Sequence, residues 1–214
     1  MTQYAFHLDG GKCTGCKTCQ VACKETYKLP VSNLYRKVYN YQGGSWKPTE
    51  AGHYVPDGVF GYFVSLACNH CSSPACVANC PTGAMQKDEE TGIVTQDTET
   101  CIGCQSCVEA CPYQAVGAGV RTYLEAEPEF LVGFPVGNSE APTHVKNTVE
   151  KCNLCYQRIS EGDLPACVEG CPTLAMTFGD LNDPESDISK LIAERECEQL
   201  LVDAGTGPCM YYLK

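Results

Sequence analysis

Residues 101–112 read Cys-Ile-Gly-Cys-Gln-Ser-Cys-Val-Glu-Ala-Cys-Pro. The four cysteines are separated by two, two and three residues, and proline follows the last one. This spacing is a ligation pattern of cubic iron-sulfur clusters, in which the fourth cysteine ligates the other cluster of a pair. The stretch therefore predicts a fold organised around pairs of clusters.

Sixteen of the 18 cysteines fall into four runs of this kind. The runs are Cys13, Cys16, Cys19 and Cys23; Cys68, Cys71, Cys76 and Cys80; Cys101, Cys104, Cys107 and Cys111; and a looser fourth, Cys152, Cys155, Cys167 and Cys171. A tetrahedral zinc site uses two Cys-x-x-Cys pairs and has no role for the additional cysteines. A disulfide framework does not need one grouping repeated four times. The runs therefore favour iron-sulfur clusters.

The spacing also predicts how the runs pair. The last two cysteines of each run are four residues apart, so on a helix their sulfurs would lie on one face, about 6 Å apart along the axis. Only residues 81–100 separate the second run from the third, and the turn-like residues 88–92 predict a hairpin joining the halves of one ferredoxin fold. The first and fourth runs then pair with each other. Pairing one with two and three with four is the alternative, but it leaves that hairpin unexplained.

Four [4Fe-4S] clusters follow from this pairing, each with three cysteines from one run and one from the partner run. The predicted ligand sets are Cys13, Cys16, Cys19 and Cys171; Cys23, Cys152, Cys155 and Cys167; Cys68, Cys71, Cys76 and Cys111; and Cys80, Cys101, Cys104 and Cys107. The six residues from Cys80, Cys-Pro-Thr-Gly-Ala-Met, recur from Cys171 as Cys-Pro-Thr-Leu-Ala-Met, which indicates an internal repeat.

The predicted fold class is α+β, with two ferredoxin-like halves related by this repeat, loop inserts and a C-terminal helix. Residues 1–30 plus 145–182 form one half, 59–120 the other, 31–58 and 121–144 are inserts, and 183–214 are the C-terminal helix and tail. Asp183 is expected to cap that helix. The aromatic side chains of the first insert, with Trp46 and Tyr54 among them, are expected to pack over the clusters. Residues 59–66 are predicted to form a strand. Cys197 and Cys209 lie outside the runs and are expected to be buried or free thiols, with a disulfide between them as the alternative outside the cytoplasm.

The chain carries a formal net charge of −11, which does not suit a nucleic-acid-binding protein. Lysines inside or beside the first and fourth runs, such as Lys12 and Lys151, make that pair of clusters the one with more positive surroundings. No apolar stretch is long enough to span a membrane, and residues 1–10 lack the features of a secretory signal. No nucleophile–base pair or glycine-rich phosphate loop is found, so no catalytic residue is predicted.

Several motifs together resemble the iron-sulfur subunit of the dimethyl sulfoxide reductase family. They are Thr14-Gly15-Cys16-Lys17-Thr18-Cys19, the stretch from Cys68 to Cys76, Cys101-Ile102-Gly103-Cys104 and Lys151-Cys152-Asn153-Leu154-Cys155. The resemblance implies a non-catalytic electron-transfer subunit beside a molybdenum or tungsten bis-pterin catalytic subunit, often with a membrane anchor that handles quinol. It also implies that the Cys13 cluster faces the catalytic subunit and the Cys101 cluster faces the membrane. Cys104 stands where nitrate reductase relatives carry tryptophan and bind a three-iron cluster, so four cubic clusters are expected in this protein.

The same resemblance implies a location on the outer, periplasmic face of the cytoplasmic membrane, reached by co-export with the catalytic subunit; a cytoplasmic location is the alternative. Two other functions remain open at this point. One is a polyferredoxin-type carrier or a subunit of a hydrogenase or formate dehydrogenase. The other is a structural protein in which clusters only hold the chain together. The insert at residues 117–150 is longer than in compact relatives, and a loop of that length is typical of partner contacts.

Overall fold

The computed structural model describes residues 1–30, 33–115, 121–123 and 138–213. The protein is a mixed α/β structure with short helices and several small sheets. In chain order the elements are β1 (Tyr4–Asp9), α1 (Thr18–Thr26), β2 (Arg36–Pro48), β3 (Tyr54–Ala67), α2 (Ala75–Ala78), β4 (Met85–Lys87), β5 (Val94–Gln96), α3 (Ser106–Glu109), α4 (Pro112–Ala115), β6 (Arg121–Tyr123), β7 (Val149–Lys151), α5 (Tyr156–Ser160), α6 (Ala166–Glu169), β8 (Met176–Asp180), α7 (Asp187–Glu194), the short 3-10 helix η1 (Val202–Ala204) and β9 (Met210–Leu213).

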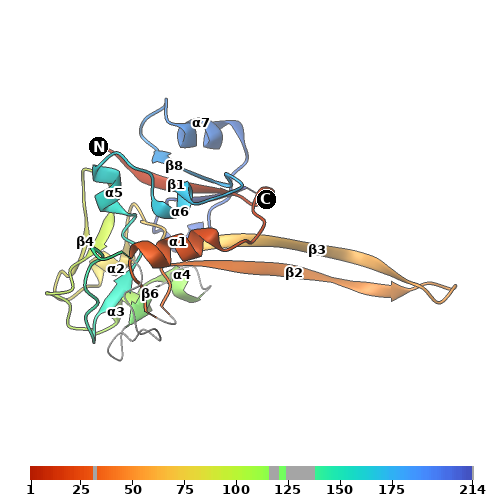
Figure 1. The fold of residues 1–214 in the computed structure, drawn as a ribbon, viewed down its shortest axis with the longest axis horizontal. Helices are drawn as coiled ribbons and strands as arrows, with labels where there is room; N and C mark the ends of the chain where they lie inside the picture. Colours follow the sequence, from red (N-terminus) through yellow and green to blue (C-terminus); the bar gives the residue numbers. More distant parts are fainter. Residues whose placement is uncertain (31–32, 116–120, 124–137, 214) are drawn as a thin grey trace.

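A three-stranded sheet joins the two ends of the chain. Strand β1 lies in its centre, antiparallel to β8 and parallel to β9, with Phe6 opposite both Phe178 and Met210. Helix α1 packs against α6, so the segment of the first cysteine run lies beside that of the fourth (Figure 1). Phe6, Leu8 and Met210 form a core with buried cysteines, because short helices and strands supply few apolar side chains of their own.

The hairpin expected between the second and third runs is present. Strands β4 and β5 pair antiparallel, and the turn between them closes with a hydrogen bond from the Gly92 nitrogen to the Asp88 carbonyl oxygen (2.8 Å). Strand β6 pairs with β7 and links residues 121–123 to 149–151. Most of the 117–150 insert, residues 117–120 and 124–137, lies outside the described residues.

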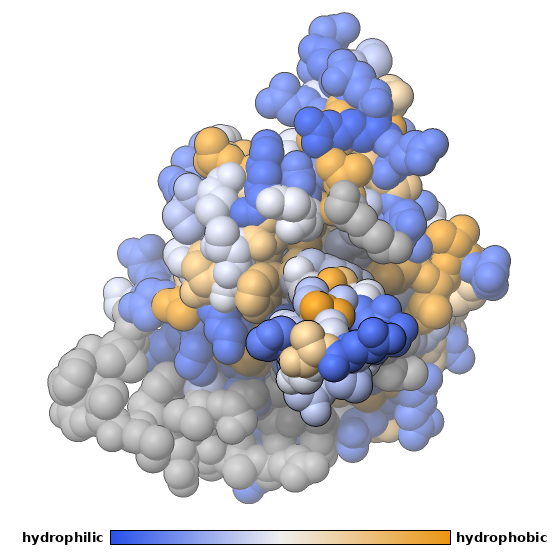
Figure 2. All heavy atoms as spheres, turned by 90° about the vertical axis from the view of Figure 1, so that its right-hand side faces the viewer, coloured by the Kyte–Doolittle hydropathy of each residue, from blue (hydrophilic) through white to orange (hydrophobic). Residues whose placement is uncertain are grey.

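A long two-stranded hairpin, β2–β3, projects from the body of the protein (Figure 1). The sequence predicted a strand only at residues 59–66, whereas β3 starts at Tyr54, so the expected boundary at residue 59 falls inside it. Trp46 and Tyr54 are 63% and 67% exposed near the tip, so the expectation that the aromatic rings of this insert pack over the clusters is wrong for these two. It is right for Tyr35, which is buried in one cluster with Cys23 and Cys152. In Figure 2, which faces the tip, apolar and polar side chains lie side by side at this end.

The C-terminal helix begins later than expected. Helix α7 starts at Asp187 and its cap is Ser186, whose hydroxyl accepts a hydrogen bond from the Ser189 nitrogen (3.3 Å), whereas Asp183 shapes the preceding turn. Ile188 on this helix is fully buried. Within the described ranges no helix combines the length and apolar character needed to cross a membrane.

Candidate iron-sulfur sites

Each cysteine run makes a left-handed turn just before its second cysteine. The φ angles there are 69° at Gly15, 41° at His70, 68° at Gly103 and 62° at Leu154. Glycine suits this conformation, and two of the four runs have it. The same turn in all four runs directs successive cysteine side chains toward one point.

The first site is a cavity between α1, the root of the hairpin and the start of β8. Four cysteines line it, three from the first run and one from the fourth: Cys13, Cys16, Cys19 and Cys171. Cys16 is exposed, and the Thr18 hydroxyl donates a hydrogen bond to its sulfur (3.3 Å) and lowers the pKa of this thiol. The Ala175 nitrogen donates to the Cys171 sulfur (3.3 Å). A methyl group at Gly15 would overlap the Phe63 ring, so glycine is also required there for space.

The site at the other end repeats these contacts. Its cavity is lined by one cysteine of the second run and three of the third: Cys80, Cys101, Cys104 and Cys107. Cys104 is exposed, and the Ser106 hydroxyl lowers the pKa of its thiol. The Met85 nitrogen donates to the Cys80 sulfur (3.4 Å), as Ala175 does to Cys171. The two terminal sites therefore share an exposed second cysteine with a hydroxyl two residues later.

The third cavity lies between them and combines the second run with the last cysteine of the third: Cys68, Cys71, Cys76 and Cys111. Burial raises the pKa of Cys71 to about 11. Tyr113 and Thr206 close the cavity and are joined through their hydroxyl oxygens (2.6 Å). The three cavities are similar in size.

The remaining four cysteines, Cys23, Cys152, Cys155 and Cys167, are buried together in the interior. Burial raises the pKa of Cys23, and the charges on the other three raise it further, so the four sulfurs lie close to one another. Burial also raises the pKa of Cys152 to about 12. Thiols so far from water ionise only when a cation binds them.

Neighbouring sites touch in one order along the protein. The charge on Cys19 of the first site raises the pKa of Cys167 in the interior site. In the same way, the charge on Cys68 of the third site raises the pKa of Cys152. Helix α2 carries Cys76 of the third site and helix α3 carries Cys107 of the fourth, and these two helices pack against each other. The interior site is therefore second in a line of four.

These groupings suit polynuclear clusters better than single ions. Among the residues described, no three His, Cys, Asp or Glu side chains are grouped as they would be around one metal ion. All 18 cysteines lie in described segments, and none of them, Cys197 and Cys209 included, forms a disulfide there. Four thiols around a cavity match the donor set of a [4Fe-4S] cluster.

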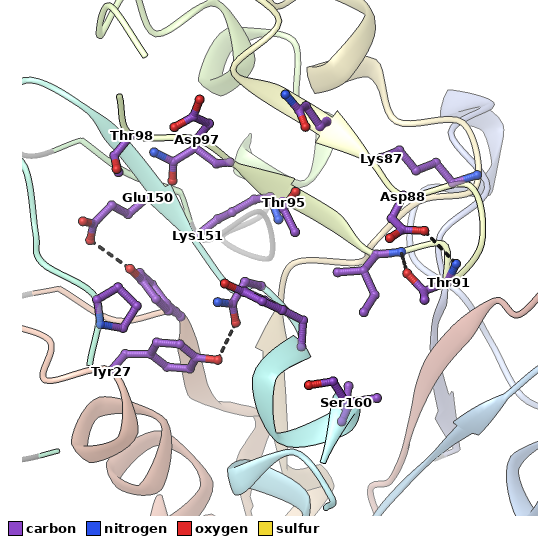
Figure 3. Close-up of a pocket in the computed structure, with 18 of the residues that line it drawn as sticks. Tyr27, Lys87, Asp88, Thr91, Thr95, Asp97, Thr98, Glu150, Lys151 and Ser160 are labelled. Atoms are coloured by element: carbon purple, nitrogen blue, oxygen red, sulfur yellow. Dashed lines mark hydrogen bonds between the residues drawn. The ribbon is translucent and has the colours of Figure 1, made fainter. Parts of the chain in front are cut away.

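A large pocket with several charged and polar side chains in its wall opens beside the interior site (Figure 3). Glu150 is buried in its wall and accepts hydrogen bonds from the Tyr35 hydroxyl (2.9 Å) and from Nδ1 of His144 (2.8 Å). Nε2 of His144 faces the carbonyl oxygens of Tyr27 (3.0 Å) and Lys28 (3.1 Å). Both ring nitrogens face acceptors, which favours the doubly protonated ring, and the hydrogen bond with Glu150 is the main cause of the raised pKa of His144.

Lys151 lies beside this pair and is also buried. Its ammonium group donates to the carbonyl oxygens of Cys152 (2.8 Å) and Val94. In the sequence Lys151 stands out only as one of the lysines near the fourth run. Arg36, Ser65 and His144 are not predicted from the sequence at all, because nothing in its local pattern links these residues to a cysteine run.

Comparison with known proteins agrees with the cysteine geometry. The family model for a 4Fe-4S dicluster domain matches residues 59–125 and 137–181, and that for a 4Fe-4S binding domain matches residues 11–31. Together these matches include all four cysteine runs.

Among curated proteins, the chain is 41% identical to the probable anaerobic dimethyl sulfoxide reductase chain YnfG of Escherichia coli, over 85% of this chain and 76% of the relative. It is 40% identical to the B subunit of the anaerobic dimethyl sulfoxide reductase of Escherichia coli over the same shares. It is 33% identical to the arsenate respiratory reductase iron-sulfur subunit ArrB of Shewanella, over 97% of this chain and 94% of that protein. The chain therefore belongs to the iron-sulfur, electron-transfer subunits of the dimethyl sulfoxide reductase family.

Proposed function

We propose that this chain binds four [4Fe-4S] clusters and relays single electrons between a quinol-side membrane anchor and a molybdenum or tungsten bis-pterin catalytic subunit. The observation that supports this proposal most directly is the grouping of the sixteen cysteines into four sets, each with three members of one run and one of another. The proposed ligands are Cys13, Cys16, Cys19 and Cys171 for cluster 1; Cys23, Cys152, Cys155 and Cys167 for cluster 2; Cys68, Cys71, Cys76 and Cys111 for cluster 3; and Cys80, Cys101, Cys104 and Cys107 for cluster 4.

A cubic cluster with four thiolate ligands exchanges one electron and has no vacant position for substrate. The chain's own residues hold the four sites in a line and control their contact with water. The second site is closed, with all four cysteines buried, while Cys16 and Cys104 expose the two terminal sites. A relay needs such exposed ends, because a partner must approach closely to give or take an electron.

The β2–β3 hairpin supports a partner contact at the first end. Val38 and Ser65 from its root line the first cavity, so the hairpin extends directly from that site. Its far part exposes Trp46, Tyr54 and Phe60, with 63%, 67% and 52% of their surfaces accessible. Aromatic side chains are enriched in protein interfaces. We therefore propose that the hairpin is an arm that binds the catalytic subunit beside cluster 1.

The relatives' names support a reductase as the partner, since they include subunits of dimethyl sulfoxide and arsenate reductases. Anaerobic co-expression with the catalytic subunit tests the proposal. The complex should contain about sixteen irons for this chain, four times the content of one [4Fe-4S] cluster, and its cluster signals should be reduced by quinol and reoxidised by the catalytic subunit's substrate. Zinc in place of iron, or a chain that elutes alone, would refute it.

We further propose that the complex lies on the outer face of the cytoplasmic membrane, exported together with its catalytic subunit. Protease treatment of intact spheroplasts distinguishes this location from the cytoplasmic alternative. Degradation of the chain in intact spheroplasts is expected, and protection until the membrane is broken would place it in the cytoplasm.

A further inference from the structure

Arg36 is a buried cation at the root of the β2–β3 hairpin. Only 1% of its surface is exposed. Its Nη1 donates a hydrogen bond to the Ser65 hydroxyl oxygen (3.2 Å), which lies 3.3 Å from the Cys19 sulfur. The guanidinium carbon sits 4.9 Å from the centre of the Phe6 ring. One hydroxyl group therefore separates this charge from a proposed ligand of cluster 1.

No carboxylate of the described residues forms an ion pair with this charge. None of the ion pairs within the described segments includes Arg36, and its Nη2 makes no hydrogen bond to a described residue. A buried charge without a counterion is strongly destabilising, so a partner is expected. The negative charges that interact with Arg36 are those of cysteine sulfurs of two different sites.

Arg36 and these sulfurs change each other's pKa. Burial lowers the pKa of Arg36, but charges on Cys167 and Cys19 outweigh it and raise that pKa overall. Burial raises the pKa of Cys167, and Arg36 opposes this rise by its charge and by a hydrogen bond. The geometry agrees, since Ala67, which faces Arg36 across the hairpin, packs in one buried cluster with Cys23 and Cys152 of the second site. Arg36 is thus positioned between the first site, through Ser65 and Cys19, and the second.

Building on the proposed relay, we propose that Arg36 is a fixed positive charge shared by clusters 1 and 2, which raises the reduction potentials of both. The electron that passes between them adds one negative charge to the receiving cluster and removes one from the donor, and no proton is required. A cation beside both sites stabilises each reduced state relative to the oxidised state. Arg36 is a positioning residue in this role, because it ligates neither cluster.

Arg36→Met tests the proposal by removing the charge and keeping an apolar side chain of similar length. The readout is a potentiometric titration of the holo-complex followed by EPR, with iron content measured on the same sample. We expect four clusters, with the equilibrium constant for reducing clusters 1 and 2 at least tenfold lower, which is 59 mV for a one-electron couple. Clusters 3 and 4 should keep their potentials. The signals are assigned with Cys16→Ser and Cys155→Ser variants.

Two controls separate charge from packing. Arg36→Lys keeps the charge. Its equilibrium constants for reducing clusters 1 and 2 should stay within about threefold of the wild-type values, which is a smaller shift than the 59 mV of a tenfold change. Lys47→Met removes a positive charge from the exposed tip of the same hairpin and should shift no potential. Unchanged potentials in a four-cluster Arg36→Met protein would overturn the inference and leave the proposed relay intact. Fewer than four clusters in the wild-type complex would instead refute the relay.

If Arg36→Met does not retain four clusters, Arg36→Gln replaces it, since glutamine keeps a donor for Ser65 without the charge. If Arg36→Lys is the only variant that retains four clusters, the reduction potentials of this variant test the proposal. Values close to wild type for clusters 1 and 2 support the shared charge, whereas a tenfold change in either constant contradicts it.

Discussion

Replacing His144 by leucine should weaken the buried connection between the end of α1 and strand β7. The imidazolium donates to Glu150 from one nitrogen and faces the carbonyl oxygens of Tyr27 and Lys28 with the other. Tyr27 follows Cys23, and Glu150 precedes Cys152, so the connection ties together the two segments that supply cluster 2. Leucine would leave Glu150 buried with the Tyr35 hydroxyl as its remaining donor among the described residues.

The magnitude follows from burial. The side chains of His144 and Glu150 are 8% and 5% exposed and 2.8 Å apart. Removing one partner of a buried ion pair costs about 3–5 kcal/mol. If about 3 kcal/mol of this appears in the unfolding barrier, cluster release should accelerate about a hundredfold, since each 1.36 kcal/mol is a factor of about ten in rate.

The pH dependence has a definite sign. The pKa of His144 is raised in the folded protein, above the value of about 6.5 for the unfolded chain. Stabilisation by its charge is therefore complete below about pH 6.5 and is lost as the pH rises through the folded pKa. The wild-type protein should release its clusters faster at higher pH, and its advantage over His144→Leu should shrink.

Loss of cluster absorbance in anaerobic guanidinium chloride, followed at several pH values, measures these rates. The rate is the right quantity, because unfolding coupled to metal loss is not a reversible two-state process. His53→Leu, at an exposed histidine between β2 and β3, is the matched control and should behave like wild type. A His144→Leu protein that releases clusters at the wild-type rate, or with a gap that is constant over pH, would refute the reasoning.

Three further outcomes are expected. Gly15→Ala should lower the occupancy of cluster 1, whereas Gly162→Ala, which has a similarly positive φ but open space around it, should keep all clusters; equal iron content in the two would contradict the crowding argument. Cys104→Ser should alter the EPR signal of one cluster and lower the iron content, while Cys209→Ser should do neither, and an iron loss with Cys209→Ser would show that the ligand sets are wrong. Replacing residues 43–60 of the hairpin by an Asn-Gly turn should preserve the clusters but abolish co-purification of the catalytic subunit, and retention of that subunit would exclude the arm.

The spacing of the cysteines carried most of the sequence prediction. A cysteine ligand is defined by its immediate neighbours in the run, so the four sets, including the distant partner Cys171, can be proposed before any contact is known. The turn at residues 88–92 likewise depends on local chemistry and appears between β4 and β5. The strand prediction at residues 59–66 was too short, because exposed strands of a free hairpin lack the apolar alternation that marks a half-buried strand.

Arg36 and His144 could not be found in this way. Each acts across more than twenty residues of chain, Arg36 toward Ser65 and His144 toward Tyr27, and single polar residues carry no periodic signal. The prediction that Asp183 caps the C-terminal helix α7 was wrong for a local reason. Asp183 and Pro184 have the composition of a helix start, but they form a turn, and Ser186 supplies the oxygen that the first helical turn requires.

The buried charges of this chain are unevenly divided between the two ends of the proposed relay. Arg36 lies between sites 1 and 2, and the buried ammonium group of Lys151 donates to the Cys152 carbonyl oxygen at site 2. Cluster potentials rise with nearby positive charge, and screening by water is weak in the interior. Lys151 also donates to Val94, which packs with Cys107 of site 4, so Arg36 is the cation that favours an electron near the hairpin end over one near Cys104. That bias suits the proposed relay if its electrons pass toward the catalytic subunit proposed at the hairpin end.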